Sequence, residues 1–379
     1  MVNALCRWVI VGLLLTGFGA QAQTDVRDVV KPDPNLSGHV ITHKKSQWIP
    51  VPWSELTGWA DDALHEAWNA WLKSCERTGT ALFSWCPQVR RLSITTSDAQ
   101  RAWFELNFQP YRVTSLNNKD EKRSEGLLTS YFEPLLEARR QAGTGFSTPL
   151  YRSPKGVDGR KVWYSREEMD TLPQAKTALE GHAIAYVADP VDALLLQIQG
   201  SGRLQITEPD GTVKMVRLAY ATTNGQAYKS VGRWLLDQGL IKDATWPGIS
   251  AWVKNNPERV SEMLWSNPRV VFFREEALKD MDLGSGPKGA QGVALTPGRS
   301  IAVDPGSIPY GAPVWLESVG SSVQLRKLVF AQDTGSAIVG AVRADYFAGW
   351  GPEAGALAGR LKQPLQLWVL WPKSAESAR

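Results

Sequence analysis

The stretch from Ile301 to Gly351 consists of short apolar segments separated by Gly and Pro, and this alternation restricts it to a β fold. Asp304, Asp333 and Asp345 each lie beside turn-forming residues in this stretch. A carboxylate at a strand end, flanked by Gly or Pro, is held rigidly while the nearby backbone stays open to a ligand. The alternative is that each Asp only bonds the backbone of its own turn, which is the common role of Asp in turns.

Length and charge limit the organisation and the partners of the chain. With 379 residues it exceeds one ordinary core, so about two domains are expected. The 42 basic and 38 acidic residues give a net charge of +4 without a block of like charge, which argues against a nucleic-acid surface. Only four His occur, and no His or Cys pair has metal-ligand spacing, so we expect neither a metal nor another cofactor.

Residues 1–22 are typical of a secretory signal peptide. Arg7 supplies the basic region, Trp8 to Phe18 the apolar core, and Ala20-Gln21-Ala22 the cleavage site. The apolar run is shorter than the ~20 residues that a membrane-spanning helix needs. An L-L-T-G sequence within it resembles a lipoprotein processing box, but Phe18 stands where the lipidated Cys would be. We therefore expect a soluble periplasmic protein without a lipid anchor.

Cleavage of the signal removes Cys6 and leaves two cysteines, Cys75 and Cys86. An even pair in an oxidising compartment indicates a disulfide, and the loop between them is short enough to close. Two unpaired buried thiols are the alternative.

The N-terminal half of the mature chain mixes helices and strands. Trp, Leu and Ala at helical spacing predict an amphipathic helix over 53–73, and its Trp residues are assigned to a core rather than to a ligand platform. A second helix is expected over 96–107. A strand with a turn at Pro134 is expected over 126–137, and Ala193 to Ile198 is expected as another strand.

From Ala138 to the C-terminus the sequence predicts mainly short strands. Helices are expected near 228–238, 257–264 and 353–361. This organisation indicates a β domain made from the two ends of the chain, with a second, mostly β domain inserted between them.

One Gly-rich motif, Gln199-Gly200-Ser201-Gly202, lacks the spacing of a dinucleotide fingerprint. Ser201 as a nucleophile with His182 as its base would lack an orienting third group. The motif could let backbone amides and the Gln199 side chain approach a polar ligand, or it could be a simple β turn. Carboxylates beside Trp, Tyr and Gly favour sugar chemistry, because aromatic rings stack on sugars and a desolvated carboxylic acid can protonate a glycosidic oxygen.

Six motifs, in order, resemble the membrane-bound lytic murein transglycosylase A family. They are Q-G-S-G from Gln199, N-G-x-A-Y-K-S from Asn224, N-P-x-x-V-F-F from Asn267, V-D-x-x-x-I-P-x-G from Val303, Q-D-T-G-x-A-I-x-G from Gln332 and A-D-x-F-x-G-x-G-x-E-A-G from Ala344. The resemblance implies a mainly β protein in which residues 23–137 and 279–379 form a catalytic domain with a double-psi β-barrel and the 3D motif. Residues 138–278 would form an inserted second β-barrel, with a few peripheral helices.

The resemblance also assigns site residues. Asp345 matches the single catalytic acid/base, Asp333 the aspartate that supports it, and Asp304 the first of the three aspartates. Glu133 matches a groove-lining position where some members have Thr, so its carboxylate is not expected to be indispensable. The other residues expected to bind substrate are Tyr131, Gln199, Gly200, Ser201, Gly202, Asn224, Tyr228, Gly335 and Ser336.

The implied reaction cleaves peptidoglycan between N-acetylmuramic acid and N-acetylglucosamine and leaves a 1,6-anhydro end. Asp345 would act first as acid and then as base, and the muramoyl C6 hydroxyl would replace the second carboxylate that glycosidases use. The alternatives are a glycan-binding module without catalysis, as in plant wall-loosening proteins, and a lysozyme-like hydrolase. Peptidoglycan strands are the expected partner of a monomer, and contact with wall-synthesis or division machinery is left open. The resemblance leaves two locations, free in the periplasm or held at the wall by the substrate alone, because Phe18 removes the acylation site that members of this family often have.

Overall fold

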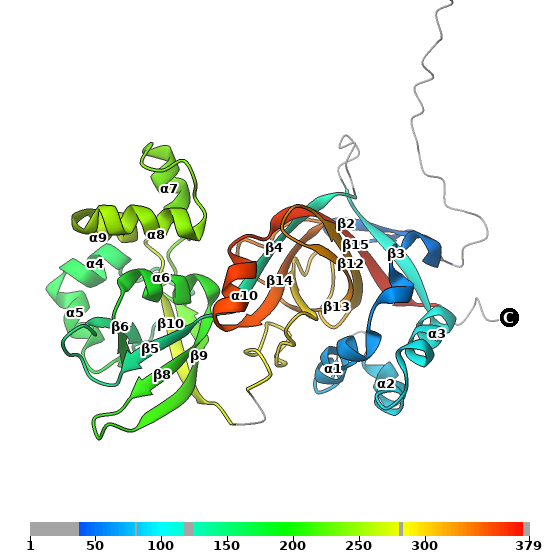
Figure 1. Ribbon diagram of the computed structural model, residues 1–379, viewed down its shortest axis with the longest axis horizontal. Helices are drawn as coiled ribbons and strands as arrows, with labels where there is room; N and C mark the ends of the chain where they lie inside the picture. Colours follow the sequence, from blue (N-terminus) through cyan, green and yellow to red (C-terminus); the bar gives the residue numbers. More distant parts are fainter. Residues whose placement is uncertain (1–37, 80–81, 117–123, 280–282, 374–379) are drawn as a thin grey trace, which may run out of the picture.

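A computed structural model describes residues 38–79, 82–116, 124–279 and 283–373 (Figure 1). The signal peptide predicted over 1–22 lies outside the described residues. The protein is mainly β, as predicted, with two sheets and peripheral helices. None of the helices in the described ranges is long and apolar enough to cross a membrane.

The larger sheet draws its strands from both ends of the chain. Its strand order is β1-β2-β3-β15-β12-β13-β11-β14-β4, and β4 also pairs with β15. This second pairing closes β15, β12, β13, β11, β14 and β4 into a barrel. The strands are β1 Ile41–Thr42, β2 Ser46–Pro50, β3 Phe108–Ser115, β4 Gly126–Glu133, β11 Ser300–Val303, β12 Pro313–Val319, β13 Gln324–Asp333, β14 Arg343–Trp350 and β15 Lys362–Pro372.

Alternating apolar residues of these strands fill the barrel. Leu128 of β4, Ile301 of β11, Val329 of β13 and Ala344 of β14 are all buried in one cluster. Because side chains alternate across a strand, the neighbours of Leu128 and Ala344 project from the outer face. Those neighbours include Thr129 and Asp345.

A helical layer covers part of the barrel: α1 Leu64–Ser74, α2 Cys86–Leu92 and α3 Ser97–Asn107. The helix predicted over 53–73 begins only at Leu64, because Gly58 in a left-handed conformation (φ 77°) separates two short 3-10 turns before it. Its Trp residues are core, as predicted, since Trp59, Trp68 and Trp71 are buried. A disulfide joins Cys75 to Cys86 and ties the end of α1 to the start of α2.

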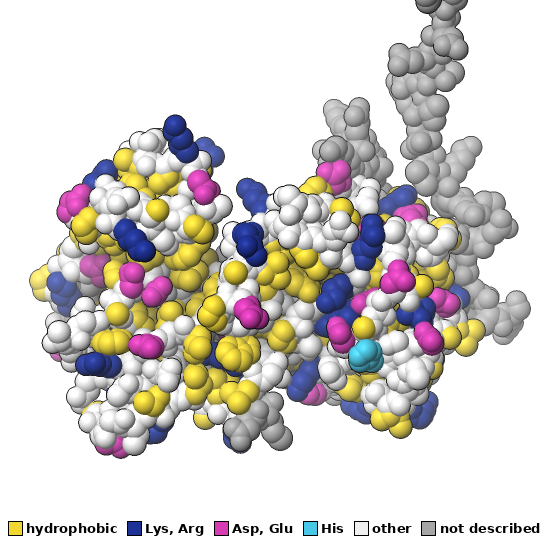
Figure 2. All heavy atoms as spheres, viewed as in Figure 1, with side chains coloured by type: hydrophobic (Ala, Val, Ile, Leu, Met, Phe, Trp, Pro, Cys, Tyr) yellow, Lys and Arg dark blue, Asp and Glu magenta, His cyan; other side chains and the backbone are white. Residues whose placement is uncertain are grey.

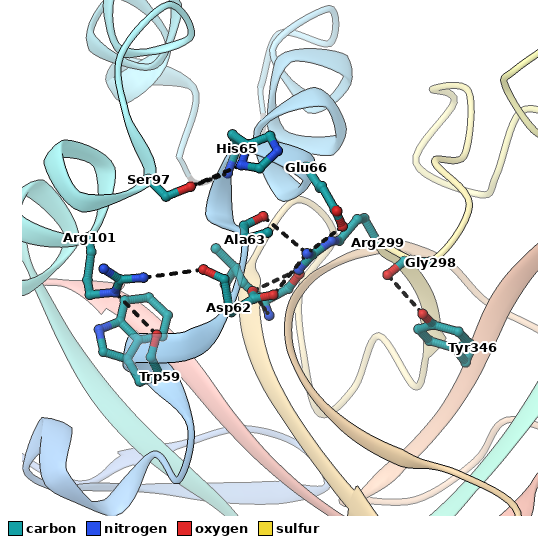
Figure 3. Close-up of polar contacts among 11 residues, drawn as sticks. Trp59, Asp62, Ala63, His65, Glu66, Ser97, Arg101, Gly298, Arg299 and Tyr346 are labelled. Atoms are coloured by element: carbon teal, nitrogen blue, oxygen red, sulfur yellow. Dashed lines mark hydrogen bonds and ion pairs between the residues drawn. The ribbon is translucent and has the colours of Figure 1, made fainter.

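A buried ion pair fixes this helical layer on the barrel (Figure 3). The guanidinium of Arg299 reaches both carboxylate oxygens of Asp62, at 2.8 and 2.9 Å, and donates to the Leu328 carbonyl at 3.0 Å. Asp62 also accepts from the Leu328 amide at 2.9 Å, and Glu66 pairs with the same guanidinium at 2.8 Å. Two buried charges are tolerated here because each is paired and hydrogen-bonded.

The smaller sheet has the order β10-β9-β8-β5-β7-β6. Six α-helices of the described residues belong to this part, which therefore holds more helix than a mostly β insert would; they lie above the sheet or to its left in Figure 1. Its elements are β5 Leu135–Arg139, β6 Thr148–Tyr151, α4 Arg166–Thr171, α5 Pro173–Leu179, β7 Ala183–Val187, α6 Pro190–Gln199, β8 Ser201–Thr207, β9 Val213–Thr223, α7 Val231–Asp237, α8 Trp246–Asn255, α9 Val260–Trp265 and β10 Val271–Ala277.

The strand predicted over Ala193 to Ile198 is wrong, because these residues lie in α6. The side chain of Asp189 caps the helix by accepting from the Val191 amide at 2.8 Å, Pro190 opens it, and Gly200 ends it in a left-handed conformation. A short apolar run does not distinguish a buried strand from a buried helix, whereas these end signals do.

The chain passes from one sheet to the other at Pro134, between the last residue of β4 and the first of β5. Helix α10, Gly351–Ala358, packs against β4 near this junction. The domain boundaries at 137/138 and 278/279 stay a prediction.

Candidate active site

Asp345 lies on β14, on the outer face of the barrel. It is in register with Thr129 of β4, to which β14 runs parallel, and with Ala302 of β11. The Thr129 hydroxyl donates to Oδ1 of Asp345, while Oδ2 has no hydrogen-bond partner within the described ranges. Burial raises the pKa of Asp345 above its ordinary value, although the Thr129 hydroxyl and the Arg343 charge act in the opposite direction. The site thus presents a carboxyl group that holds its proton more readily than a free Asp and has one free oxygen.

Arg343 acts on Asp345 through Thr129. It precedes Asp345 by two residues, so both side chains lie on the same face of β14. Its Nη2 donates to Thr129 Oγ1 at 2.8 Å. A Thr hydroxyl has a single proton, and here that proton points to Asp345 while Arg343 occupies a lone pair. This chain of hydrogen bonds from Arg343 through Thr129 to Asp345 orients the Asp345 carboxyl group and favours its ionised form.

Asp333 ends β13 and is held at both oxygens. The Tyr131 hydroxyl donates to Oδ2 at 2.8 Å, and the amides of Ala290 and Thr334 donate to Oδ1, both at 2.9 Å. Burial raises the pKa of Asp333, and these three donors act against that rise. Burial and the Asp333 charge raise the pKa of Tyr131 well above its ordinary value, so Tyr131 remains a donor. Asp333 is a fixed acceptor, in contrast to Asp345.

Asp304 bonds the local backbone, as the chemistry of turns predicts. It accepts from the amides of Gly306 at 3.0 Å and Gly340 at 2.9 Å, and Lys45 pairs with it at 2.8 Å. Burial alone would raise the pKa of Asp304, but Lys45 and the two amides outweigh it and lower that pKa. Its contact with Gly340 ties the loop before β14 to the barrel.

Glu133 does not lie on an open groove, where the family resemblance placed it. Its side chain is 0 % exposed and pairs with Arg217 at 2.8 Å and Arg203 at 3.2 Å. Both arginines also donate to the Ser285 carbonyl, at 2.6 and 3.0 Å. Since Glu133 ends β4 and the arginines belong to β8 and β9, the cluster clamps the barrel to the second sheet.

The Gln199-Gly200-Ser201-Gly202 motif connects α6 to β8. The Gln199 side chain accepts from the Phe132 amide of β4 at 3.0 Å, while Ser201 is buried. At Gly202 a Cβ would lie 2.2 Å from the buried Leu196 side chain, so a larger residue would force that side chain to move. The motif therefore secures the junction of the two sheets instead of forming an open ligand loop.

Gln199 also lines an apolar cavity of about 360 Å³ between α6 and α10, together with Phe132 and Trp246. Figure 2 shows apolar side chains gathered over this junction. Phe132 lies on the face of β4 opposite to that of Thr129 and Tyr131. The strand therefore separates the cavity from Asp345 and Asp333.

The remaining residues expected to bind substrate differ in exposure. Asn224 is fully buried and bonds the backbone of Tyr164 and Pro268, which indicates a structural role. Tyr228 is exposed. Gly335 is half-buried and Ser336 is exposed in the loop that follows Asp333.

Sequence reasoning missed Thr129, Arg343, Arg203 and Arg217. Arg343 had a weak signal, because it stands two residues before Asp345, and residues two apart share a face wherever the chain forms a strand. The partners of Glu133 had none, since they lie 70 and 84 residues away. No group of His, Cys, Asp and Glu in the described part of the chain could hold a metal ion.

Comparisons with known proteins match this site to a family. A family model described as the MltA specific insert domain matches residues 127–274, and a 3D domain model matches residues 299–371. A solved lytic transglycosylase of Burkholderia pseudomallei is 41% identical, with 89% of this chain and 98% of that chain covered and a TM-score of 0.59. The chain belongs to the membrane-bound lytic murein transglycosylase A family.

Two further members extend this comparison. Membrane-bound lytic murein transglycosylase A of Vibrio cholerae is 31% identical over 260 residues, which are 66% of each chain. The match thus spans slightly less than two thirds of that relative. The Escherichia coli MltA structure with bound chitohexaose shares the fold, with 23% identity, a TM-score of 0.67, and 89% of this chain and 96% of that chain covered.

Replacing Arg343 should move the pH dependence of activity. In Arg343→Met the positive charge and the bond to Thr129 are lost, so the pKa of Asp345 should rise further. If protonated Asp345 is the acid, kcat/KM should fall at a higher pH than in the wild type. Arg326→Met removes a surface guanidinium paired with Glu317 and is the control. If the fall of kcat/KM at high pH occurs at the same pH as in the wild type, or at a lower pH, the role of Arg343 is contradicted.

Replacing Glu133 should destabilise the protein. Glu133→Gln leaves two buried guanidiniums facing a neutral amide, which costs about 3 kcal/mol when one partner of a buried pair is removed. Chemical denaturation measures this loss. Glu262→Gln removes the exposed partner of Arg259 and should leave the unfolding midpoint unchanged. Equal midpoints for wild type and Glu133→Gln would show that the cluster does not clamp the sheets.

Proposed function

We propose that this protein is a lytic transglycosylase that cleaves the β-1,4 bond between N-acetylmuramic acid and N-acetylglucosamine in peptidoglycan and leaves 1,6-anhydromuramic acid ends. The observation that carries the proposal is Asp345, a partly buried carboxyl group with a raised pKa and one free oxygen. It stands in the part of the chain that matches the 3D domain. The names of the relatives supply the substrate class, and the chitohexaose bound to the E. coli protein is a β-1,4-linked glycan.

The reaction begins with protonated Asp345. Its proton passes to the glycosidic oxygen, the C1–O bond breaks, and N-acetylglucosamine leaves with a new hydroxyl. The muramoyl ring then carries an oxocarbenium-like charge at C1. A raised pKa suits this step, because the acid must be protonated near neutral pH.

The same carboxyl group completes the reaction as a base. Ionised Asp345 takes the proton of the C6 hydroxyl while the C6 oxygen bonds to C1, which restores the acid and closes the anhydro ring. The intramolecular hydroxyl has a high effective concentration, so no activated water is needed. Thr129 keeps Oδ1 oriented through both steps, and the ionised form is favoured by Arg343.

Asp333 suits a supporting role better than that of a second acid. Three donors hold its two oxygens, whereas a proton donor needs a free oxygen that faces the substrate. As a carboxylate near Asp345 it would stabilise positive charge at C1. The substrate's own acetamido group is the other source of that stabilisation.

The proposed location is the periplasmic side of the cell envelope, without lipidation, because Phe18 occupies the acylation position. Labelling cells with a fatty-acid precursor should leave the protein unlabelled. Acylated protein in the outer membrane would contradict this location. A monomer that contacts glycan strands is the proposed working form, and contact with wall-synthesis machinery stays a prediction.

Digestion of murein sacculi tests the reaction. The wild type should release 1,6-anhydromuropeptides, which mass spectrometry distinguishes from hydrolysis products because they are lighter by one water. Asp345→Asn should lose turnover by at least about a hundredfold, the lower range for a general acid, and still bind sacculi. Asp237→Asn, an exposed change on α7, should keep wild-type turnover.

Three results would contradict the proposal. Reducing-end products from the wild type would indicate a hydrolase. Sacculus binding without release would indicate a glycan-binding module. Substantial turnover by Asp345→Asn would exclude Asp345 as the acid.

A further inference from the structure

A polar cavity of about 590 Å³ lies beside Asp333 on the barrel side of the molecule. Arg77, Gln291 and Tyr310 line it, together with Ala290. The Ala290 amide donates to Asp333 Oδ1, so the cavity begins one residue from the candidate active site. It is distinct from the apolar cavity under α10.

Three separate segments build the walls. The first follows α1 and is anchored by the disulfide at Cys75, the second is the loop before β11, and the third is the turn after β11. Gly289 lets the loop lie directly on β13, because a Cβ there would be 2.5 Å from the Gln332 carbonyl. The cavity is therefore a product of the tertiary fold.

A buried network fixes the floor. The side-chain Nε2 of Gln332 donates to Ser74 Oγ at 2.8 Å, and Ser74 Oγ donates to the side-chain Oε1 of Gln291 at 3.2 Å. The backbone amide of Gln291 donates to the backbone carbonyl of Gln332 at 3.0 Å. Gln291 is only 7 % exposed, and its Nε2 has no partner within the described ranges. A buried amide donor without a partner costs free energy unless a ligand accepts from it.

The charged group of the cavity is the exposed guanidinium of Arg77. It rests against the backbone of Gly292, and no described carboxylate pairs with it. Glu76 also lines the cavity, but its carboxylate pairs with Lys73 at 3.5 Å. The Arg77 guanidinium and the side-chain Nε2 of Gln291 are both hydrogen-bond donors, which is the arrangement that a carboxylate ligand requires.

We propose that this cavity binds a carboxylate of the peptide stem of peptidoglycan while the glycan lies at Asp345. This inference rests on the proposed function. The stem hangs from the muramic acid whose bond is cleaved, so a site next to Asp333 is within its reach. Arg77 lies outside the segments that match the family models, whereas Tyr310 lies inside the 3D domain match.

Calorimetric titration of the catalytically silenced Asp345→Asn protein tests the site without turnover. The probes are a disaccharide–tetrapeptide, the same disaccharide without peptide, and the tetrapeptide form with its carboxylates amidated. Arg77→Gln, added to this background, should weaken binding of the first probe about three- to tenfold, as expected for one partly exposed charge-assisted contact. Binding of the other two probes should not change.

Arg91→Gln is the matched control, because it removes an exposed guanidinium of α2 that does not line the cavity. It should leave binding of all three probes unchanged. Equal binding of the first probe with and without Arg77, or an equal loss for all three, would overturn the proposal. The two proposals fail in different experiments. The titration tests only the carboxylate site, whereas the proposed function is refuted if the wild type releases no anhydro products from sacculi.

Discussion

The parallel pairing of β4 with β14 is the contact on which the rest of the site depends. It brings Thr129 opposite Asp345, although 216 residues separate them in the chain. The same strand contributes Tyr131, which holds Asp333. A slip of one residue would turn both side chains to the barrel interior and send Leu128 outward. The apolar alternation that fills the barrel therefore also sets the geometry around Asp345.

The end of β4 couples this geometry to the second sheet. Glu133 faces Arg203 and Arg217 within a buried cluster, and Trp350 of β14 stacks on Arg203 at 4.2 Å. Such a cluster is costly to bury but specific, because its charges are compensated only when both sheets are docked. The strand that carries Thr129 and Tyr131 is thus clamped at its end. Substitutions at the clamp act on the site through the position of β4.

The sequence predicted the β character of the stretch from Ile301 to Gly351 and the strand that begins at Gly126, because apolar alternation and Gly or Pro turns are local signals. It also ranked Asp345 above Asp304, through a resemblance and not through physics. It misassigned α6 because an apolar run of this length suits either period. The resemblance placed Glu133 on a groove, and nothing local in the sequence marks a buried carboxylate that would have corrected this. Arg203 and Arg217 are ordinary strand residues until the fold brings them to Glu133. Long-range pairing was the missing information in each case.

The central claim is that burial keeps Asp345 protonated more readily than a free carboxylic acid while Thr129 holds it in place. A carbon-13 NMR titration of labelled Asp carboxyl groups measures this directly, with Asp345→Asn and Asp333→Asn used to assign the two resonances. The account predicts that the Asp345 resonance titrates above the ordinary Asp value of about 3.9. A pKa at or below that value would contradict it, because the acid would then be ionised under the conditions in which it must donate.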